Sequence, residues 1–266
     1  MSASLSGYRK IDFSRDGRIL RVSINSPETR NAVDDELHHE LSRVFYDVND
    51  DPDSDVVILS GTGKFFCAGG DMGWFQGMID DPARWRAILA PAKRITTSLL
   101  ELEKPIICRL NGAAAGLGAS LALLCDIVVA AENALIGDPH VKMGLVAADG
   151  GTFLWPQLVG YHRAKELLLT GRMLTAQAAH EMGLFNYVVP ADQLDGKVDE
   201  LARELAAGSQ LAIRWTKTAT NLELRRHALA VTEAGVAYET INQQQHDHQE
   251  AVNAFSARRA PQFQSK

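Results

Sequence analysis

Two stretches rich in glycine and alanine, FFCAGGD at residues 65–71 and NGAAAGLGAS at residues 111–120, decide how this sequence is read. Each follows an apolar segment typical of a buried strand, and its glycines let the backbone approach a ligand without intervening side chains. Two such turns that face each other can present two backbone N–H donors to one oxygen, which stabilises a developing oxyanion. The alternative is tight packing of strands against helices. The first interpretation predicts chemistry on a carbonyl group.

Strand and helix patterns alternate around these stretches and continue as helices to the C-terminus. Apolar periodicity predicts strands at residues 19–24, 56–59, 105–110 and 127–130, and a short extended piece at 188–190. It predicts helices over 37–48 with Asp34 or Asp35 as N-cap, 82–102 with a break near Pro91, 162–170, 175–182 with Gly183 as C-cap, 194–207, 210–222 and 224–244. We therefore expect an α/β fold with a strand-rich core and a helical C-terminal third. The apolar faces of the late helices favour packing against another subunit.

Size, charge and cysteine content restrict the classes of protein that this chain can belong to. Its 266 residues, 46% hydrophobic and 23% charged, are typical of a globular protein with a substantial core. A net charge of −6 argues against general binding of nucleic acids. The chain has no apolar run of about 20 residues to span a membrane, and its first residues lack the pattern of a secretory signal. The three cysteines, Cys67, Cys108 and Cys125, lie in apolar contexts. We expect them to be buried, reduced thiols in a cytoplasmic protein.

Several further motifs, in order, resemble the crotonase superfamily, also called the enoyl-CoA hydratase/isomerase family, over nearly the whole chain. They are NAV at 31–33, the segment 61–71, KPII at 104–107 leading into NG at 111–112, CDI at 125–127, LLTG at 168–171, AA at 178–179, GL at 183–184 and AFSARRAP at 254–261. The resemblance implies a spiral of ββα units over residues 1–200 that carries the site, and a helical region over 201–266 for oligomerisation. It also implies homotrimers, often paired into hexamers, and a substrate carried as a coenzyme A thioester. It implies no permanently bound cofactor and no metal.

The resemblance also implies which residues bind the coenzyme A thioester. The two positions whose N–H groups bind the thioester oxygen in the family are Gly70 and Leu117 here, where leucine replaces the commoner glycine but keeps the backbone N–H. Ala68 matches a position that meets the adenine through its backbone, and Arg30 a basic position beside the CoA phosphates. The substrate-binding or CoA-binding residues that we expect are Arg30, Ala68, Gly70, Asp71, Met72, Leu117, Arg258 and Arg259. From charge alone, Arg30, Arg258, Arg259 and Lys266 are either a local patch for a phosphorylated molecule or a solvated surface.

The residues that move protons depart from the family's hydratases, which use two glutamates. Those positions are Ser120 and His140 here, so an ordinary two-glutamate hydratase is not expected. Asp149 has apolar or small neighbours, and a carboxylate facing a pocket there would have a raised pKa and act as a general base. Its position matches the proton-shuttling carboxylate of enoyl-CoA and dienoyl-CoA isomerases. Alternatively, Asp149 caps a helix beginning near Gly150.

His140 and Ser120 can also be explained by structural roles that involve no chemistry. His140 either contributes to the pocket or lies in a solvated turn after Asp138-Pro139. Ser120 is expected first as a small residue in helix packing and second as a hydrogen-bonding partner of the substrate. The acyl group is not readable from the sequence. Met72, Trp74, Phe75 and Trp155 suggest aromatic pocket walls, although large apolar residues are more often part of the core.

The preferred hypothesis is an acyl-CoA enzyme that stabilises a thioester enolate and uses one carboxylate, Asp149, to isomerise a double bond or to hydrate it atypically. His140 would assist or orient water. The first alternative is cleavage of a C–C or aryl–halide bond. An aromatic dehalogenase of the superfamily has its nucleophilic aspartate at the position of Asp149. A branch that hydrolyses cyclic β-diketones has an aspartate there too, followed by a pair like Trp155-Pro156, but it needs a histidine where Leu117 stands. The second alternative is a non-catalytic scaffold that binds CoA esters or RNA.

Overall fold

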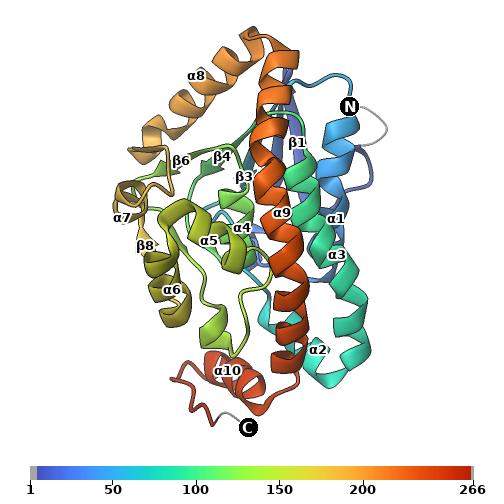
Figure 1. Cartoon of the computed structure of the whole chain (residues 1–266), viewed down its shortest axis with the longest axis vertical. Coiled ribbons are helices and arrows are strands. Elements are labelled where there is room, and N and C mark those ends of the chain that lie inside the picture. Colours follow the sequence, from blue (N-terminus) through green and yellow to red (C-terminus); the bar gives the residue numbers. More distant parts are fainter. Residues whose placement is uncertain (1–4, 265–266) are drawn as a thin grey trace.

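Two β-sheets and a surrounding set of helices make up the computed structural model, which describes residues 5–264 (Figure 1). The larger sheet has the strand order β1-β2-β3-β4-β6-β9. Its strands are β1 (Ile11–Asp16), β2 (Ile19–Ile24), β3 (Val56–Gly61), β4 (Ile106–Leu110), β6 (Ile127–Ala131) and β9 (Tyr187–Val189). Strand β1 pairs antiparallel with β2, and the other neighbours pair parallel. The smaller sheet contains β5 (Ala114–Ala115), β7 (Leu135–Gly137) and β8 (Leu174–Thr175).

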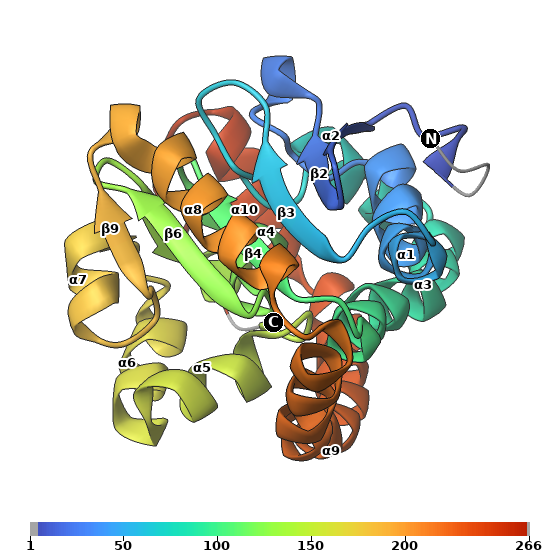
Figure 2. The ribbon, with the colours of Figure 1, turned by 90° about the horizontal axis from the view of Figure 1, so that it is seen from above.

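The helices cover both faces of the larger sheet. They are α1 (Asp35–Asp50), α2 (Met72–Asp80), α3 (Pro82–Glu101), α4 (Leu117–Leu123), α5 (Gly151–Val159), α6 (Tyr161–Thr170), α7 (Ala176–Glu181), α8 (Leu194–Ala207), α9 (Gln210–Gln243) and α10 (His246–Ser256). Helix α8 crosses one face of this sheet, as Figure 2 shows from above. Side chains alternate across a strand, and Val56 and Ile58 of β3 pack toward α8. Val57 and Leu59 enter the main core on the opposite face.

The C-terminal helices close the side of the molecule that lies away from α8. Helix α9 runs along α3 and α5, and α10 packs on α2 and on the short 3₁₀ helix η3 (His140–Met143) (Figure 1). The boundary that we expect at residue 200 lies inside α8. No helix within residues 5–264 is both long enough and apolar enough to cross a membrane. All three cysteines are buried and free, as the sequence predicts.

Several predicted boundaries are confirmed, and two are wrong. Asp34 is the N-cap of α1, and its side chain accepts a hydrogen bond from the Leu37 N–H at 2.8 Å. The expected break near Pro91 is absent, and α3 continues through this residue. Buried side chains before and after Pro91 hold the helix in place on both sides. The expected division at residues 222–224 is absent too. Helix α9 is continuous there, since no glycine or proline interrupts it. Strands β1, β5, β7 and β8 and helices α2 and α10 were not predicted.

Candidate active site

The two glycine-rich stretches lie against each other at main-chain contact distance. Cys67 and Ala114 form a parallel bridge, in which Cys67 N–H donates to Ala113 O at 3.1 Å and Ala115 N–H to Cys67 O at 3.0 Å. A Cβ atom on Gly118 would lie 2.3 Å from Cys67 O, so only glycine fits there without movement of the backbone. The sequence-based expectation that these turns face each other therefore matches the fold.

Backbone directions place two N–H groups toward the space beside these stretches. Val33 N–H donates to Gly69 O at 2.8 Å, and Asp71 N–H to Val33 O at 2.9 Å. Because the N–H groups of neighbouring residues in an extended ladder point to opposite sides, the Gly70 N–H points away from Val33. Leu117 is the first residue of α4, where a helix leaves its N–H without an intrahelical acceptor. Both residues line one cavity.

This cavity has a volume of about 920 Å³ and is walled by residues from distant parts of the chain. All predicted site residues except Ser120 line it: Arg30, Ala68, Gly70, Asp71, Met72, Leu117, His140, Asp149, Arg258 and Arg259. Helices α2 and α3 contribute an apolar wall, which includes Trp74, Phe75, Met78, Trp85, Ile88 and Leu89. Trp155 does not belong to it, because its side chain is fully buried in the main core. The concave shape and mixed lining are those of a small-molecule site.

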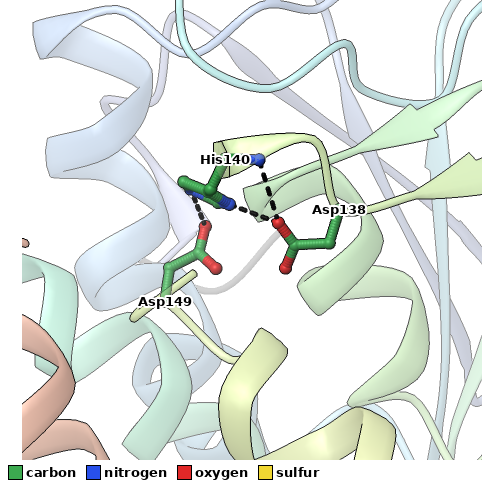
Figure 3. Close-up of side chains that lie close together, drawn as sticks. All are labelled: Asp138, His140 and Asp149. Carbon is green, nitrogen blue, oxygen red and sulfur yellow. Dashed lines mark hydrogen bonds and ion pairs between the residues drawn. The ribbon is translucent and has the colours of Figure 1, made fainter. Parts of the chain in front are cut away.

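Asp138, His140 and Asp149 form a row of three polar side chains (Figure 3), of which His140 and Asp149 line the cavity. His140 Nδ1 meets Asp138 Oδ1 in a short hydrogen bond, and His140 Nε2 lies 3.5 Å from Asp149 Oδ2. Ser120 Oγ donates to the other Asp149 oxygen at 3.1 Å. A Cβ on Gly116 would lie 3.2 Å from the His140 ring, so this ring packs directly beside the start of α4. The imidazole therefore connects one fully buried carboxylate with one that faces the cavity.

The local chain explains why these side chains meet. Asp138 follows β7, His140 begins η3, and Asp149 lies in the loop before α5. Gly150, not Asp149, is the N-cap of α5, so the capping interpretation of Asp149 is wrong. The Asp149 carboxylate turns toward Ser120 instead, which also explains why Ser120 is completely buried but still polar. His140 is only 12% exposed at its side chain, which excludes the solvated-turn interpretation.

Burial and mutual charge set the protonation of this row. Burial raises the pKa of Asp149 to about 6, with the charge of His140 opposing the shift. Burial alone would lower the pKa of His140, but the carboxylates of Asp138 and Asp149 raise it well above its usual value. Near neutral pH, Asp149 is an ionised carboxylate of unusually high basicity beside an imidazolium.

The same three residues could also be read as a metal site, since one ligand atom of each lies within 4.8 Å of the others. The geometry favours proton transfer. The two ring nitrogens of His140 face different carboxylates, so both are already directed at partners. A metal ion could use only one of these nitrogens and would have to replace a hydrogen bond or ion pair. The row is therefore better suited to hold and move protons than to hold a cation.

The predicted cationic residues surround the outer part of the cavity. Arg30 is exposed, has a left-handed backbone (φ 63°) and places its guanidinium 5.5 Å from the Phe65 ring centroid. Arg259 binds the Glu250 carboxylate through its two terminal nitrogens, Nη1 at 2.5 Å and Nη2 at 2.8 Å, which offsets its charge. Asp71 caps α2 by accepting from Trp74 N–H at 3.0 Å. Arg30 and Arg258 are thus the cations more available to an anionic ligand.

One cavity residue was missed by the sequence interpretation. Glu239 lies on α9, and its side chain lines the same cavity as Asp149 and His140. Burial raises its pKa to about 8, and the charge of Asp149 adds to this shift. Residues 231–241 around it mix apolar and polar side chains as an ordinary surface helix does, so the sequence offers no signal for this carboxyl group.

Comparisons with known proteins identify the family of this chain. The chain matches the enoyl-CoA hydratase/isomerase family over residues 14–266. It is 34% identical to the 1,2-epoxyphenylacetyl-CoA isomerase of Escherichia coli, over 93% of this chain and 95% of that protein. A solved enoyl-CoA hydratase/isomerase from Mycobacterium paratuberculosis superposes with a TM-score of 0.88 at 35% identity, covering 92% of this chain and 97% of that one. A β-diketone hydrolase from the cyanobacterium Anabaena superposes with a TM-score of 0.86 at 32% identity, covering 92% and 98%. The chain therefore belongs to the enoyl-CoA hydratase/isomerase family and has its crotonase fold.

Proposed function

We propose that this enzyme forms an enolate of an acyl-CoA thioester and uses Asp149 to move the proton, most simply to isomerise a carbon–carbon double bond. Membership of the family implies coenzyme A thioesters as substrates. One observation carries the proposal: a carboxylate with a pKa of about 6 faces the cavity beside the first turn of α4. That turn begins with the free N–H of Leu117 and holds the carboxylate through Ser120.

The chemistry follows from these groups. A thioester oxygen bound by the Gly70 and Leu117 N–H groups would accept the electron pair released when Asp149 removes a proton from the α-carbon. Each such donor contributes about 2.7–4 kcal/mol in the transition state, and a positioned base contributes about 10²–10⁴-fold. The proton then returns at the γ-carbon, which turns a 3-enoyl ester into a 2-enoyl ester. Atypical hydration would use the same enolate, with His140 orienting water.

The rest of the thioester would follow the cavity outward. Arg30 and Arg258 are suited to the CoA phosphates, because an exposed guanidinium binds phosphate oxygens through several N–H donors. The Ala68 N–H already donates to Arg30 O at 3.2 Å, which leaves the Ala68 carbonyl as the group available to the adenine amine. Asp71 and Met72 would contact the thioester arm near Gly70. The apolar wall from α2 and α3 would receive the acyl group.

A panel of CoA thioesters tests this function. Purified enzyme is incubated with 2-enoyl, 3-enoyl, dienoyl, aryl and β-keto esters and followed by mass spectrometry, absorbance and retention time. We expect a 3-enoyl ester to isomerise without a change of mass, and Asp149→Asn to lose about 10²–10⁴-fold in turnover while thioester affinity survives. Unchanged turnover of Asp149→Asn would refute the assignment, and a mass gain of water on a 2-enoyl ester would favour hydration.

Cleavage of a C–C bond is a second candidate, because His140 and Asp149 could together hold and activate a water molecule. The likeness to the β-diketone hydrolase supports it, whereas Leu117 offers no side-chain hydrogen bond to a substrate. Hydrolysis of a cyclic β-diketone that carries no coenzyme A would favour this candidate. An ester adduct trapped on Asp149 with an aryl-halide thioester would instead indicate the dehalogenase-like reaction.

We also propose that the protein assembles as a homotrimer or a pair of trimers. Exposed apolar side chains, among them Tyr161, Leu169 and Ile241, border a second, largely apolar hollow over α5, α6 and the end of α9. Such a surface favours burial against another subunit. Light scattering of the purified protein should report the mass of three or six chains, and a monomeric mass would contradict this proposal.

A further inference from the structure

Helix α9 brings a second carboxyl group to the base. Gly235 of α9 packs directly on the segment that ends in Asp149, since a Cβ on Gly235 would lie 3.2 Å from Ala148 Cβ. Glu239 lies one turn further along α9, on the same face, because residues four apart are neighbours on a helix surface. Its side chain lines the cavity together with Asp149 and His140. The contact at Gly235 therefore fixes Glu239 on the side of the cavity where Asp149 stands.

The environments of the two carboxyl groups separate their protonation states. Burial raises the pKa of Glu239 to about 8 and that of Asp149 to about 6, and the charge of His140 opposes both shifts. Between these values Asp149 is ionised and Glu239 is protonated, which is the arrangement expected of a base and an acid that share a site. Within residues 5–264, the Glu239 carboxyl forms no hydrogen bond or ion pair with another side chain. Its proton is thus available to a bound molecule.

We propose that Glu239 is the proton donor of the reaction and protonates the γ-carbon of the substrate after Asp149 has removed the α-proton. This inference rests on the proposed function. The α C–H bond breaks and its proton goes to Asp149, while the electron pair passes to the thioester oxygen. The pair then returns through the double bond to the γ-carbon, which takes the proton of Glu239. Exchange with solvent afterwards deprotonates Asp149 and reprotonates Glu239, so atoms and charge balance over one turnover.

Reactions of two substrates in D₂O distinguish the role of the base, Asp149, from that of the proton donor, Glu239. Isomerisation of a 3-enoyl-CoA needs both the base and the donor, whereas exchange of the α-protons of phenylacetyl-CoA for deuterium needs only the base and the oxyanion donors. In Glu239→Gln we expect isomerisation to fall by about 10²–10⁴-fold, with α-exchange close to that of the unaltered enzyme. Asp149→Asn should lose both. Glu233→Gln, an exposed glutamate of the same helix that pairs with Lys93, is the matched control and should lose neither.

The position of solvent deuterium in the isomerised product gives a second measurement. With Glu239 as a separate donor, the unaltered enzyme should place solvent deuterium at the γ-carbon from the first turnover. Full retention of the substrate's α-proton there would show that Asp149 alone carries it and would overturn the inference. So would normal isomerisation by Glu239→Gln, or an equal loss of both activities, which indicates a structural role. Absence of α-exchange in the unaltered enzyme would refute the proposed function itself, and this inference with it.

Discussion

The candidate site has one region formed by main-chain groups and another formed by side chains. The two regions depend on different physical properties of the chain. The backbone region, residues 67–71 and 114–118, needs close approach of two chains and free N–H groups, which glycine permits. The side-chain region, Asp138, His140 and Asp149, needs burial and mutual charge to set its protonation. Changes of side chain should therefore be tolerated in the first region where no steric limit exists, but should alter chemistry in the second.

The largest effect should come from titrating the side-chain region. Asp149 must be ionised to act as a base, and its pKa is raised to about 6. Turnover should therefore be present above this pH and fall about tenfold for each unit below it, or about 100-fold by pH 4. An ordinary aspartate would keep its activity down to about pH 4. The pH profile of kcat/KM, with folding checked by circular dichroism at each pH, measures this limb. A profile flat from pH 7 to 4.5 would contradict the assignment.

The next largest effect should come from adding a single methyl group to the backbone region. In Gly118→Ala the new Cβ would meet Cys67 O at 2.3 Å, so one chain must move. We expect a loss of about 1–3 kcal/mol in the free energy of unfolding, with loss of turnover as Leu117 is displaced. Gly196→Ala in α8 is the matched control, because nothing lies within 4 Å of its new Cβ. Chemical denaturation compares the two, and equal stability of both variants would show that the stretches do not need this contact.

A smaller effect should follow removal of the hydrogen bond between Ser120 and Asp149. This bond lowers the pKa of Asp149, so Ser120→Ala should raise that pKa and shift the acid limb of the pH profile upward. A hydrogen bond to a charged group contributes about 1.5–3 kcal/mol, which raises the pKa by about one to two, so turnover at pH 7 should fall about twofold to fifteenfold. Ser42→Ala, which removes a buried hydroxyl bonded to His39 O in α1, should leave the limb unmoved. An unshifted limb in Ser120→Ala would mean that the serine serves packing alone.

The same contrast explains what could be predicted from the sequence. Most strands of the larger sheet, most helices and the two glycine-rich turns follow from periodicity and composition, which are local properties. Asp149 could be singled out because its neighbours are small or apolar. Its partnership with Asp138 through His140, and the presence of Glu239, depend on segments that only the tertiary fold brings together. The roles of Ser120 and Trp155 likewise depended on whether burial placed them beside the carboxylate or in the core.

The smallest effect should be seen at Leu117, although it lies at the centre of the proposed oxyanion site. Only its N–H is needed there, and that group is fixed by its position at the start of α4 rather than by its side chain. We expect Leu117→Ala to lose less than about tenfold in turnover, or about 1.4 kcal/mol. Gly70→Ala tests the opposite case, since its Cβ would lie 2.3 Å from the Phe75 ring and disturb the other donor. Steady-state kinetics of both variants measure the difference. If Leu117→Ala lost as much as Gly70→Ala, its side chain would be part of the chemistry, and the division between backbone and side-chain regions would not hold at this residue.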